Sequence, residues 1–403
     1  MGMLSLVVWA LAASALGGAA ADWPGWRGPR RDGKSPETGL LKQWPEGGPE
    51  RLWQADGIGK GFSTVAVTGG MVFTTGDIDG RLRIFAFDLA GKPKWRTDVD
   101  AAWTRSHPGA RSTPEIDAGL LYVVSGNGVV ACLDAKTGRK RWSRQMSEFG
   151  GGTPGWGYAE TPLIFRDSAI VCPGGRKCIV ALDKKTGKTQ WTSRGYSGAA
   201  QYGSSIIVPF GRGNVVVTGT RAGIVGVNAR NGAFLWSNSW SANNTANCPT
   251  PAYSGAYVFW ANGYGKGGVC LKLERSGDGL AARQAWTTRD MNCHHGGYII
   301  HEGYIYGNNG GGWACLELKS GRKMWEERGV GKGSVCFADG MLYLFGESGG
   351  QAGLATCSPR GMEMKGTFRV DGSGPSWAYP VVVGGRLYLR YDTHLYCFNV
   401  KAK

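Results

Sequence analysis

Short apolar segments separated by glycine-containing turns run along most of the chain. The stretch from 112 to 144 is typical of this pattern, and it divides into the segments Ser112 to Ile116, Leu120 to Ser125, Val129 to Leu133 and Arg139 to Arg144. Segments that are this short, rich in β-branched residues and bounded by turns are typical of β-strands. The pattern therefore predicts four strands within this stretch.

One phrase returns along the chain: an apolar residue, then Asp, Asn or Glu, then a turn ending in Gly, with Trp four residues after that Gly. Clear copies end at Trp95, Trp142, Trp191, Trp236 and Trp325, a looser copy ends at Trp286, and a seventh near Lys365 lacks the Trp. Successive tryptophans are 39 to 50 residues apart. This period suits the four-stranded blade of a β-propeller. Each Trp is then expected to pack against the neighbouring blade.

The two ends of the repeat region complement each other. The C-terminal segment supplies three strand-like stretches and stops at Lys403, whereas Arg51 to Gln54 resembles an outer strand with no strands ahead of it. An N-terminal strand that completes the last blade closes the ring and removes an exposed edge. We therefore predict an all-β, eight-bladed propeller over residues 50–403, preceded by an N-terminal arm over residues 22–49.

The first 21 residues differ from the rest of the chain. They are uncharged and apolar, and they end in three alanines directly before Asp22. This is the pattern of a cleaved secretory signal, although the usual basic residue at its start is missing. Gly17 and Gly18 interrupt the segment, which argues against a membrane anchor. We expect a monomeric periplasmic or secreted protein with no transmembrane segment.

The formal net charge of +16 comes from basic residues scattered over the turns, as at Lys136 and Arg139. Nucleic-acid binding favours a clustered basic patch, so we expect no nucleic-acid partner. Of the ten cysteines, Cys132, Cys315 and Cys397 occupy matching repeat positions, where a small apolar side chain fits the core. Cys172 and Cys178 flank a predicted hairpin and are candidates for a disulfide, a question that the sequence leaves open.

The phrase Ala-Xaa-Asp-Xaa-Xaa-Thr-Gly-Lys-Xaa-Xaa-Trp resembles the repeat of the quinoprotein alcohol dehydrogenase-like propeller superfamily, with its pyrroloquinoline-quinone-like repeats. The resemblance covers about Glu50 to Val400. Within that superfamily the chain is similar to the exported BamB-like group, and its start from Asp22 to Gly33 resembles members whose activity is generally unassigned. The resemblance implies a fold rather than a chemistry.

Residues that directly precede the innermost strand of each blade are expected to meet a ligand in the central funnel. The candidates are polar or aromatic for the start of buried strands. They are Arg111, Glu160, Gln201, Asn247, His294, His295 and Trp377.

Two functions follow from these candidates. The resemblance implies that Glu160 and Asn247 match the calcium ligands of quinoprotein dehydrogenases, that Arg111 could meet a cofactor carboxylate and that Trp377 could stack. However, the family's Asp is replaced near His294 and its pair of neighbouring cysteines is missing. We therefore expect no cofactor and assign no catalytic residue. The predicted function is a binding scaffold for an envelope protein, peptide or glycan, with a calcium- and pyrroloquinoline-quinone-dependent alcohol or sugar dehydrogenase as the alternative.

The sequence Cys293-His294-His295 also suggests a softer metal, because Cys and His are ligands for such ions. Adjacent residues on an extended strand point to opposite sides, so only one of the two histidines is expected to line the funnel. A metal site would then need ligands from other blades, such as Cys248 or Glu160. We therefore prefer a structural role for these residues, in which the second histidine packs between blades or bonds to a backbone carbonyl.

Overall fold

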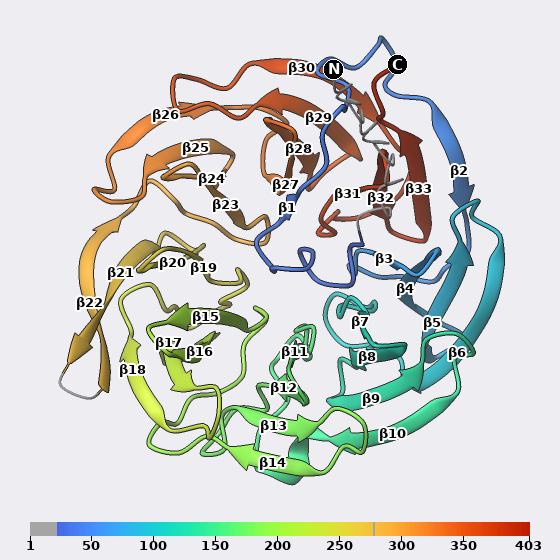
Figure 1. Cartoon of the computed structure of the whole chain (residues 1–403). Coiled ribbons are helices and arrows are strands. Elements are labelled where there is room, and N and C mark those ends of the chain that lie inside the picture. The colour runs from blue at the N-terminus through green and yellow to red at the C-terminus, as the bar shows by residue number, and fades with distance from the viewer. Residues whose placement is uncertain (1–21, 277–278) are drawn as a thin grey trace, which may run out of the picture.

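Eight antiparallel sheets of four repeat strands each surround a central axis, as the computed structural model shows (Figure 1). We number these sheets blades 1 to 8 in chain order. The structure describes residues 22–276 and 279–403, so the predicted signal segment lies outside the described residues. Within the described part, no helix has the length and apolar character needed to span a bilayer.

The strands follow the repeat. Blade 1 consists of β3 (Ala66–Thr68), β4 (Met71–Ile78), β5 (Arg81–Asp88) and β6 (Pro93–Ala101), and blade 2 consists of β7 (Glu115–Asp117), β8 (Leu120–Val124), β9 (Val129–Asp134) and β10 (Lys140–Gln145). Blade 3 consists of β11 (Leu163–Phe165), β12 (Ser168–Val171), β13 (Val180–Asp183) and β14 (Thr189–Thr192), and blade 4 consists of β15 (Ile206–Phe210), β16 (Gly213–Thr220), β17 (Gly223–Asn228) and β18 (Phe234–Asn238). Blade 5 consists of β19 (Ala252–Ser254), β20 (Tyr257–Asn262), β21 (Gly267–Ser276) and β22 (Gly279–Thr288). Blade 6 consists of β23 (Tyr298–His301), β24 (Tyr304–Asn309), β25 (Gly312–Glu317) and β26 (Lys323–Glu327). A short 3₁₀ helix, η1 (Met146–Phe149), follows β10.

Blades 7 and 8 combine strands from both ends of the chain. Blade 7 consists of β27 (Gly333–Ala338), β28 (Met341–Gly346), β29 (Gln351–Thr356) and β30 (Met364–Arg369), and the short arm strand β1 (Lys34–Ser35) adds to β27 in parallel. Blade 8 consists of β31 (Val381–Val383), β32 (Arg386–Tyr391), β33 (His394–Asn399) and β2 (Arg51–Ala55). Because β2 pairs with β33 and places Trp53 opposite Cys397, the predicted closure by an N-terminal strand is confirmed.

The repeated Trp and Gly of the phrase contact each other across blade boundaries. The indole Nε1 of Trp142 donates to the Lys184 carbonyl oxygen of the next blade at 3.1 Å. In that next blade, a Cβ on Gly187 would lie 2.8 Å from the same indole ring, so the turn glycine makes room for the preceding blade's tryptophan. Trp95 repeats this arrangement with the Ala135 carbonyl and Gly138. The predicted packing of Trp against the neighbouring blade is confirmed at these positions.

Most of the apolar core lies between blades. Ile84 on β5 and Leu121 on β8, for example, are fully buried in one cluster that joins blades 1 and 2. Cys132, Cys315 and Cys397 are buried as predicted. Cys172 and Cys178 are also buried, and both thiols are free, so the candidate disulfide is not formed in this structure.

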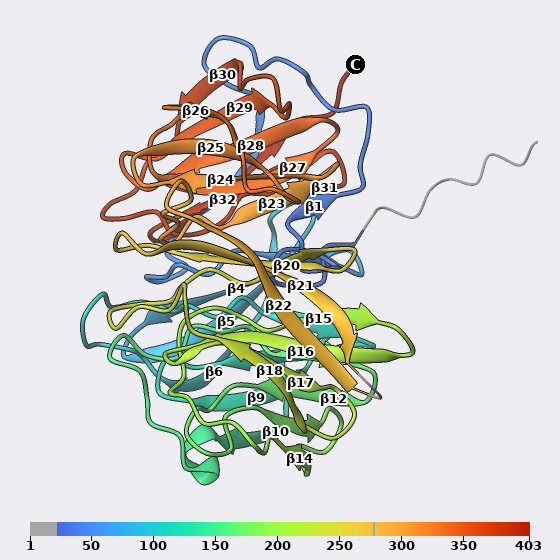
Figure 2. The same ribbon diagram turned by 90° about the vertical axis from the view of Figure 1, so that its left-hand side faces the viewer.

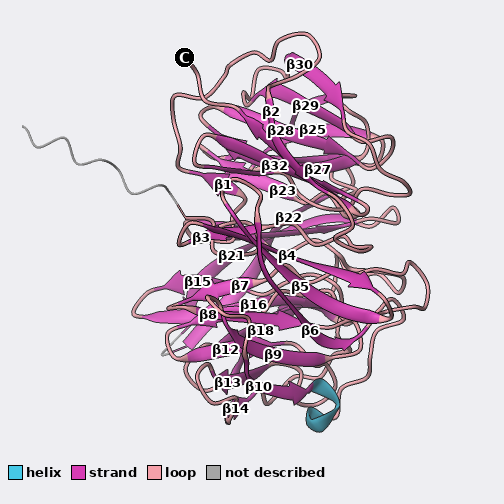
Figure 3. Ribbon diagram, turned by 90° about the vertical axis from the view of Figure 1, so that its right-hand side faces the viewer, coloured by secondary structure: helices cyan, strands magenta, loops and turns pink. Residues whose placement is uncertain are grey.

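The N-terminal arm runs along one face of the disc and reaches the hub, whereas η1 lies at the opposite face (Figures 2 and 3). Arg31 is buried there, donating to the Ser205 carbonyl oxygen at 3.0 Å and to the Glu115 carboxylate at 2.7 Å. Arg27 donates to the Tyr298 carbonyl oxygen of blade 6. The arm therefore links blades 2, 4 and 6 across the axis and closes one end of the hub.

Candidate functional site

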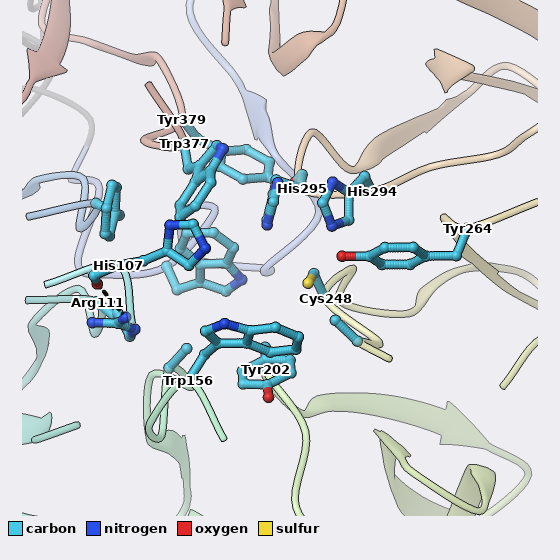
Figure 4. A pocket seen from close by; sticks show the side chains of 14 residues that line it. His107, Arg111, Trp156, Tyr202, Cys248, Tyr264, His294, His295, Trp377 and Tyr379 are labelled. Carbon is cyan, nitrogen blue, oxygen red and sulfur yellow. Dashed lines mark hydrogen bonds between the residues drawn. The ribbon is translucent and has the colours of Figure 1, made fainter. Parts of the chain in front are cut away.

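A pocket of about 240 Å³ lies at the hub, above the arm (Figure 4). Aromatic and histidine side chains form most of its wall. It is lined by Trp26, Phe62, His107, Arg111, Trp156, Ala159, Tyr202, Ala246, Cys248, Tyr264, His294, His295, Trp377 and Tyr379. Among the described residues that line the pocket, none carries a carboxylate.

The topology of the blades explains why these residues meet. Arg111, Tyr202, Cys248 and Trp377 lie in the segments that lead into the innermost strands β7, β15, β19 and β31. Innermost strands begin beside the axis, so residues that are far apart in the sequence converge there. Trp26 enters from the arm and closes the pocket, and its Nε1 donates to Thr250 Oγ1 at 3.0 Å.

On one wall of the pocket, the ring of Trp377 contacts the rings of both His295 and Phe62. Its ring stacks on His295, with ring centroids 4.2 Å apart and planes inclined by 25°. Phe62 lies 4.5 Å from Trp377 by ring centroids on the same wall. Across the pocket, Trp156 and Tyr202 pack with ring centroids 5.7 Å apart. Aromatic surfaces of this kind bind apolar groups and planar rings.

Arg111 lines the pocket, and its guanidinium is bound by backbone carbonyl oxygens of its own loop. Its guanidinium donates to the carbonyl oxygens of His107 at 2.5 Å and Ser106 at 3.3 Å, and it lies 5.7 Å from the centroid of Phe62. Burial lowers the pKa of Arg111 to about 10 and outweighs the opposite effect of Asp77. The side chain therefore remains charged at neutral pH.

Both histidines of the pair line the pocket, so the expectation that only one would do so is wrong. The segment from Met291 to Gly297 is bent rather than extended, and the two rings lie 3.6 Å apart by their centroids. Burial lowers the pKa of His294 to about 4, with a smaller contribution from Lys332, and burial also holds the pKa of His295 well below its ordinary value. Both imidazoles are therefore neutral at physiological pH.

Cys248 completes a group of three possible metal ligands at this wall. The ligand atoms of Cys248, His294 and His295 all lie within 4.8 Å of one another. Burial raises the pKa of the Cys248 thiol to about 12. An unmetallated Cys248 is thus a neutral thiol beside neutral imidazoles, which is not the thiolate–imidazolium pair of a nucleophilic cysteine.

Three of the seven sequence candidates do not line the pocket. Glu160 is buried, and its Oε1 accepts the backbone N–H of Cys172 at 2.7 Å. Gln201 and Asn247 bond to each other, with the Asn247 N–H donating to Gln201 Oε1 at 2.9 Å. Arg111, His294, His295 and Trp377 are the candidates that the fold brings together at the pocket. The direction of the other three side chains depends on partners in neighbouring loops.

The residues present do not fit the calcium ion that quinoprotein dehydrogenases imply. Calcium takes six to eight oxygen ligands, usually including ionised carboxylates. Burial raises the pKa of Glu160 to about 8, so this carboxyl is protonated at neutral pH. Asn247 Oδ1 already accepts the backbone N–H of Asn243 at 2.9 Å, and Asp290, the carboxylate a few residues before His294 in the sequence, is paired with Lys323 at 2.9 Å. These residues therefore do not fit a calcium-bound quinone.

Sequence reasoning missed several pocket residues. Phe62 precedes β3, so the rule applied to the other blades would have found it. Trp26 and Tyr264 lie in the arm and in the β20–β21 hairpin, and their places depend on the tertiary structure. Tyr379 also lies in the wall, and its hydroxyl donates to the His295 carbonyl oxygen at 2.6 Å.

Comparison with known proteins places the chain among propellers of this repeat type. The family model described as outer membrane protein assembly factor BamB matches residues 45–148 and 83–327. A quinohemoprotein alcohol dehydrogenase ADH IIB of Pseudomonas putida is 31% identical over 27% of this chain and 17% of its own length. A BamB of Nitrosomonas eutropha is 29% identical over 38% of this chain and 34% of its own length. The chain thus spans about a third or less of these curated relatives.

Among solved structures, BamB from Moraxella catarrhalis resembles this protein with a TM-score of 0.61. The likeness covers 88% of this chain and 98% of that chain, at 14% sequence identity. At this level of identity the likeness shows the fold alone.

Proposed function

The chain belongs to the family of pyrroloquinoline-quinone-like repeat propellers that the BamB model describes, and on this premise we propose that it is a non-catalytic binding protein of the cell envelope. Its hub pocket binds an aromatic or apolar side chain presented by a protein partner. The export pattern of residues 1–21 supports an envelope location.

The observation that carries this proposal is the aromatic wall of the pocket. Seven of its lining side chains are Trp, Tyr or Phe, namely Trp26, Phe62, Trp156, Tyr202, Tyr264, Trp377 and Tyr379. Burial of an aromatic or apolar group between such rings is favourable, because both surfaces lose contact with water. The pocket, with a volume of about 240 Å³, is large enough to take one aromatic side chain.

The dehydrogenase alternative gains no support from the site. Chemistry on an alcohol needs a base and an electron acceptor held beside the substrate. Burial lowers the pKa of His294 to about 4 and makes its imidazole a weak base, and the two residues that match the family's calcium ligands are tied into hydrogen bonds elsewhere. Binding is the function that this wall supports better.

Site-specific photo-crosslinking in the producing cell tests the proposal. Tyr264 is 53% exposed at the pocket, so a photoreactive residue there should crosslink to one partner, and the additional change Trp377→Ala should abolish the adduct. Phe234 is 39% exposed on the outer strand β18 and serves as the control position, where no such adduct is expected.

A calorimetric titration with pyrroloquinoline quinone and calcium tests the alternative on the same protein. We expect no saturable heat. Tight binding that is lost in Glu160→Ala, together with dye-linked alcohol oxidation, would overturn the binding proposal in favour of the dehydrogenase.

A further inference from the structure

The group Cys248, His294 and His295 combines ligands from two blades at one point of the pocket wall. Cys248 lies in the segment before β19 of blade 5, whereas both histidines lie in the segment that joins β22 of blade 5 to β23 of blade 6. Their ligand atoms lie within 4.8 Å of one another, and Figure 4 shows all three side chains at the same side of the pocket. The arrangement is built by the tertiary structure, because 46 residues separate Cys248 from His294.

The imidazole nitrogens of this group have unused capacity for a ligand. His294 Nε2 and His295 Nδ1 are both buried, and neither has a hydrogen-bond partner among the described residues. A buried polar atom without a partner is unfavourable, so two of them on adjacent rings call for an explanation. A metal ion bound to these nitrogens would satisfy both at once.

We propose that Cys248, His294 and His295 form a binding site for a divalent transition metal ion, with Zn²⁺ as the preferred occupant. A thiolate and two imidazoles are the ligand types of Zn²⁺, and they disfavour calcium and magnesium, which take oxygen ligands. The site lies in the wall of the pocket proposed above for a protein partner, but metal binding at these three side chains requires no partner. It also differs from the calcium site that the resemblance implied, which involved Glu160 and Asn247.

The site needs only a small adjustment to hold the ion. Ligand atoms of a tetrahedral zinc site lie roughly 3.3–3.7 Å apart, given the usual bond lengths. The ligand atoms lie within 4.8 Å of one another, so the three side chains must approach by at most about 1.5 Å to bind one ion. Three protein ligands leave the fourth position open toward the aromatic pocket, where water or a donor group of the pocket's occupant can bind.

A lysine–glutamate pair lies behind His294 and fixes its ring. Lys332 Nζ lies 2.8 Å from His294 Nδ1 and 2.7 Å from Glu347 Oε2. In the metal-free protein Lys332 donates to Nδ1, so the ring proton is on Nε2. Metal binding at Nε2 moves this proton to Nδ1, and Lys332 then turns to Glu347 alone. Because an ammonium only donates, Lys332 favours the tautomer that metal binding must replace, and it thereby lowers the metal affinity of the site.

Titration with Co²⁺, a spectroscopic substitute for Zn²⁺, tests the site in the purified mature chain. We expect one Co²⁺ per chain, visible absorption bands of a tetrahedral ion and a near-ultraviolet thiolate-to-cobalt band, all of which disappear when Zn²⁺ is added. Cys248→Ser should remove the thiolate band and weaken Zn²⁺ binding by at least tenfold. Cys357→Ser changes the other half-buried cysteine, which lies in blade 7. This control variant should leave the thiolate band and the Zn²⁺ affinity unchanged.

A second measurement needs no variant. Alkylation of the wild-type protein, followed by peptide mass spectrometry, reports on Cys248 directly, and Zn²⁺ should protect this cysteine while leaving Cys357 reactive. The proposal is overturned if the wild type gives no thiolate band, or if Zn²⁺ leaves the alkylation of Cys248 unchanged. Both readouts use the isolated protein, so they succeed or fail independently of any crosslinked partner.

Discussion

Glu160 shows how burial alone can redirect a residue from the role that its sequence position suggests. Its carboxyl lies behind the pocket wall, with Oε1 bonded to the Cys172 N–H and Oε2 buried without a partner among the described residues. Transfer of a charge from water to such a place is costly, so the side chain holds its proton instead. A protonated carboxyl is a poor calcium ligand.

This shift makes a prediction about stability and pH. Burial raises the pKa of Glu160 from 4.5 to about 8, so between these values the folded protein holds a proton that the unfolded chain releases. Stability therefore falls as pH rises through this window, by up to about 1.4 kcal/mol per pH unit from this group. Glu160→Gln keeps the acceptor and cannot ionise, so it should flatten the decline. Denaturant unfolding at pH 5 and pH 8 measures the effect.

The exposed Glu46 supplies the control, because Glu46→Gln should leave the pH dependence of the wild type intact. Equal slopes for the wild type and Glu160→Gln would show that Glu160 is ionised in the folded protein at neutral pH.

At the scale of the element, the repeat phrase encodes a contact between blades as well as a turn. The Trp of one blade lies over the turn Gly of the next, so each copy depends on its neighbour. Trp236 differs, because its ring packs against Gly226 of its own blade and its Nε1 has no partner among the described residues. The following blade has the looser copy of the phrase.

Two glycine substitutions separate the contribution of turn conformation to stability from the contribution of the Trp–Gly contact between blades. Gly187 has φ of 71° and would place a Cβ 2.8 Å from Trp142, whereas Gly119 has φ of 78° and would meet nothing within 4 Å. Gly119→Ala should cost about 1–2 kcal/mol for backbone conformation alone. Gly187→Ala should cost about 1–3 kcal/mol more, because the methyl group displaces the indole. Thermal unfolding compares the two, and equal losses would exclude the contact as a source of stability.

At the scale of the whole molecule, the ring is closed by a single strand from the far end of the chain. Trp53 on β2 carries the repeat contact across this closure, with its Nε1 donating to the Leu89 carbonyl oxygen of blade 1 at 2.9 Å. Its ring also packs against Tyr388 of blade 8, with ring centroids 5.9 Å apart. The side chain thus joins the last blade to the first.

Trp53→Ala should therefore weaken closure. We expect a loss of about 2–3 kcal/mol, somewhat below the value for a fully buried Trp, and earlier proteolytic cleavage near β2. Leu52 on the same strand is 42% exposed, so Leu52→Ala is the matched control and should change little. Similar losses in both variants would mean that the strand, rather than the Trp contact, holds the ring closed.

The sequence by itself determined the blade period, the number of blades and the closing strand. Those features rest on local turn chemistry and on a Trp–Gly contact that recurs at fixed spacing, so they can be counted along the chain. The same regularity indicated where the hub segments lie, which is why Arg111, His294, His295 and Trp377 were found.

The tertiary structure decided which side chains enter the pocket. Trp26 reaches Thr250 across 224 positions of the sequence, and no local pattern encodes such a contact. The bend at His294 and His295 turns both rings to one side, while partners in adjacent loops hold Glu160, Gln201 and Asn247 behind the wall. Side-chain direction in irregular loops depends on long-range packing and hydrogen bonds, so the chemistry of this hub depends on how the blades pack around the arm.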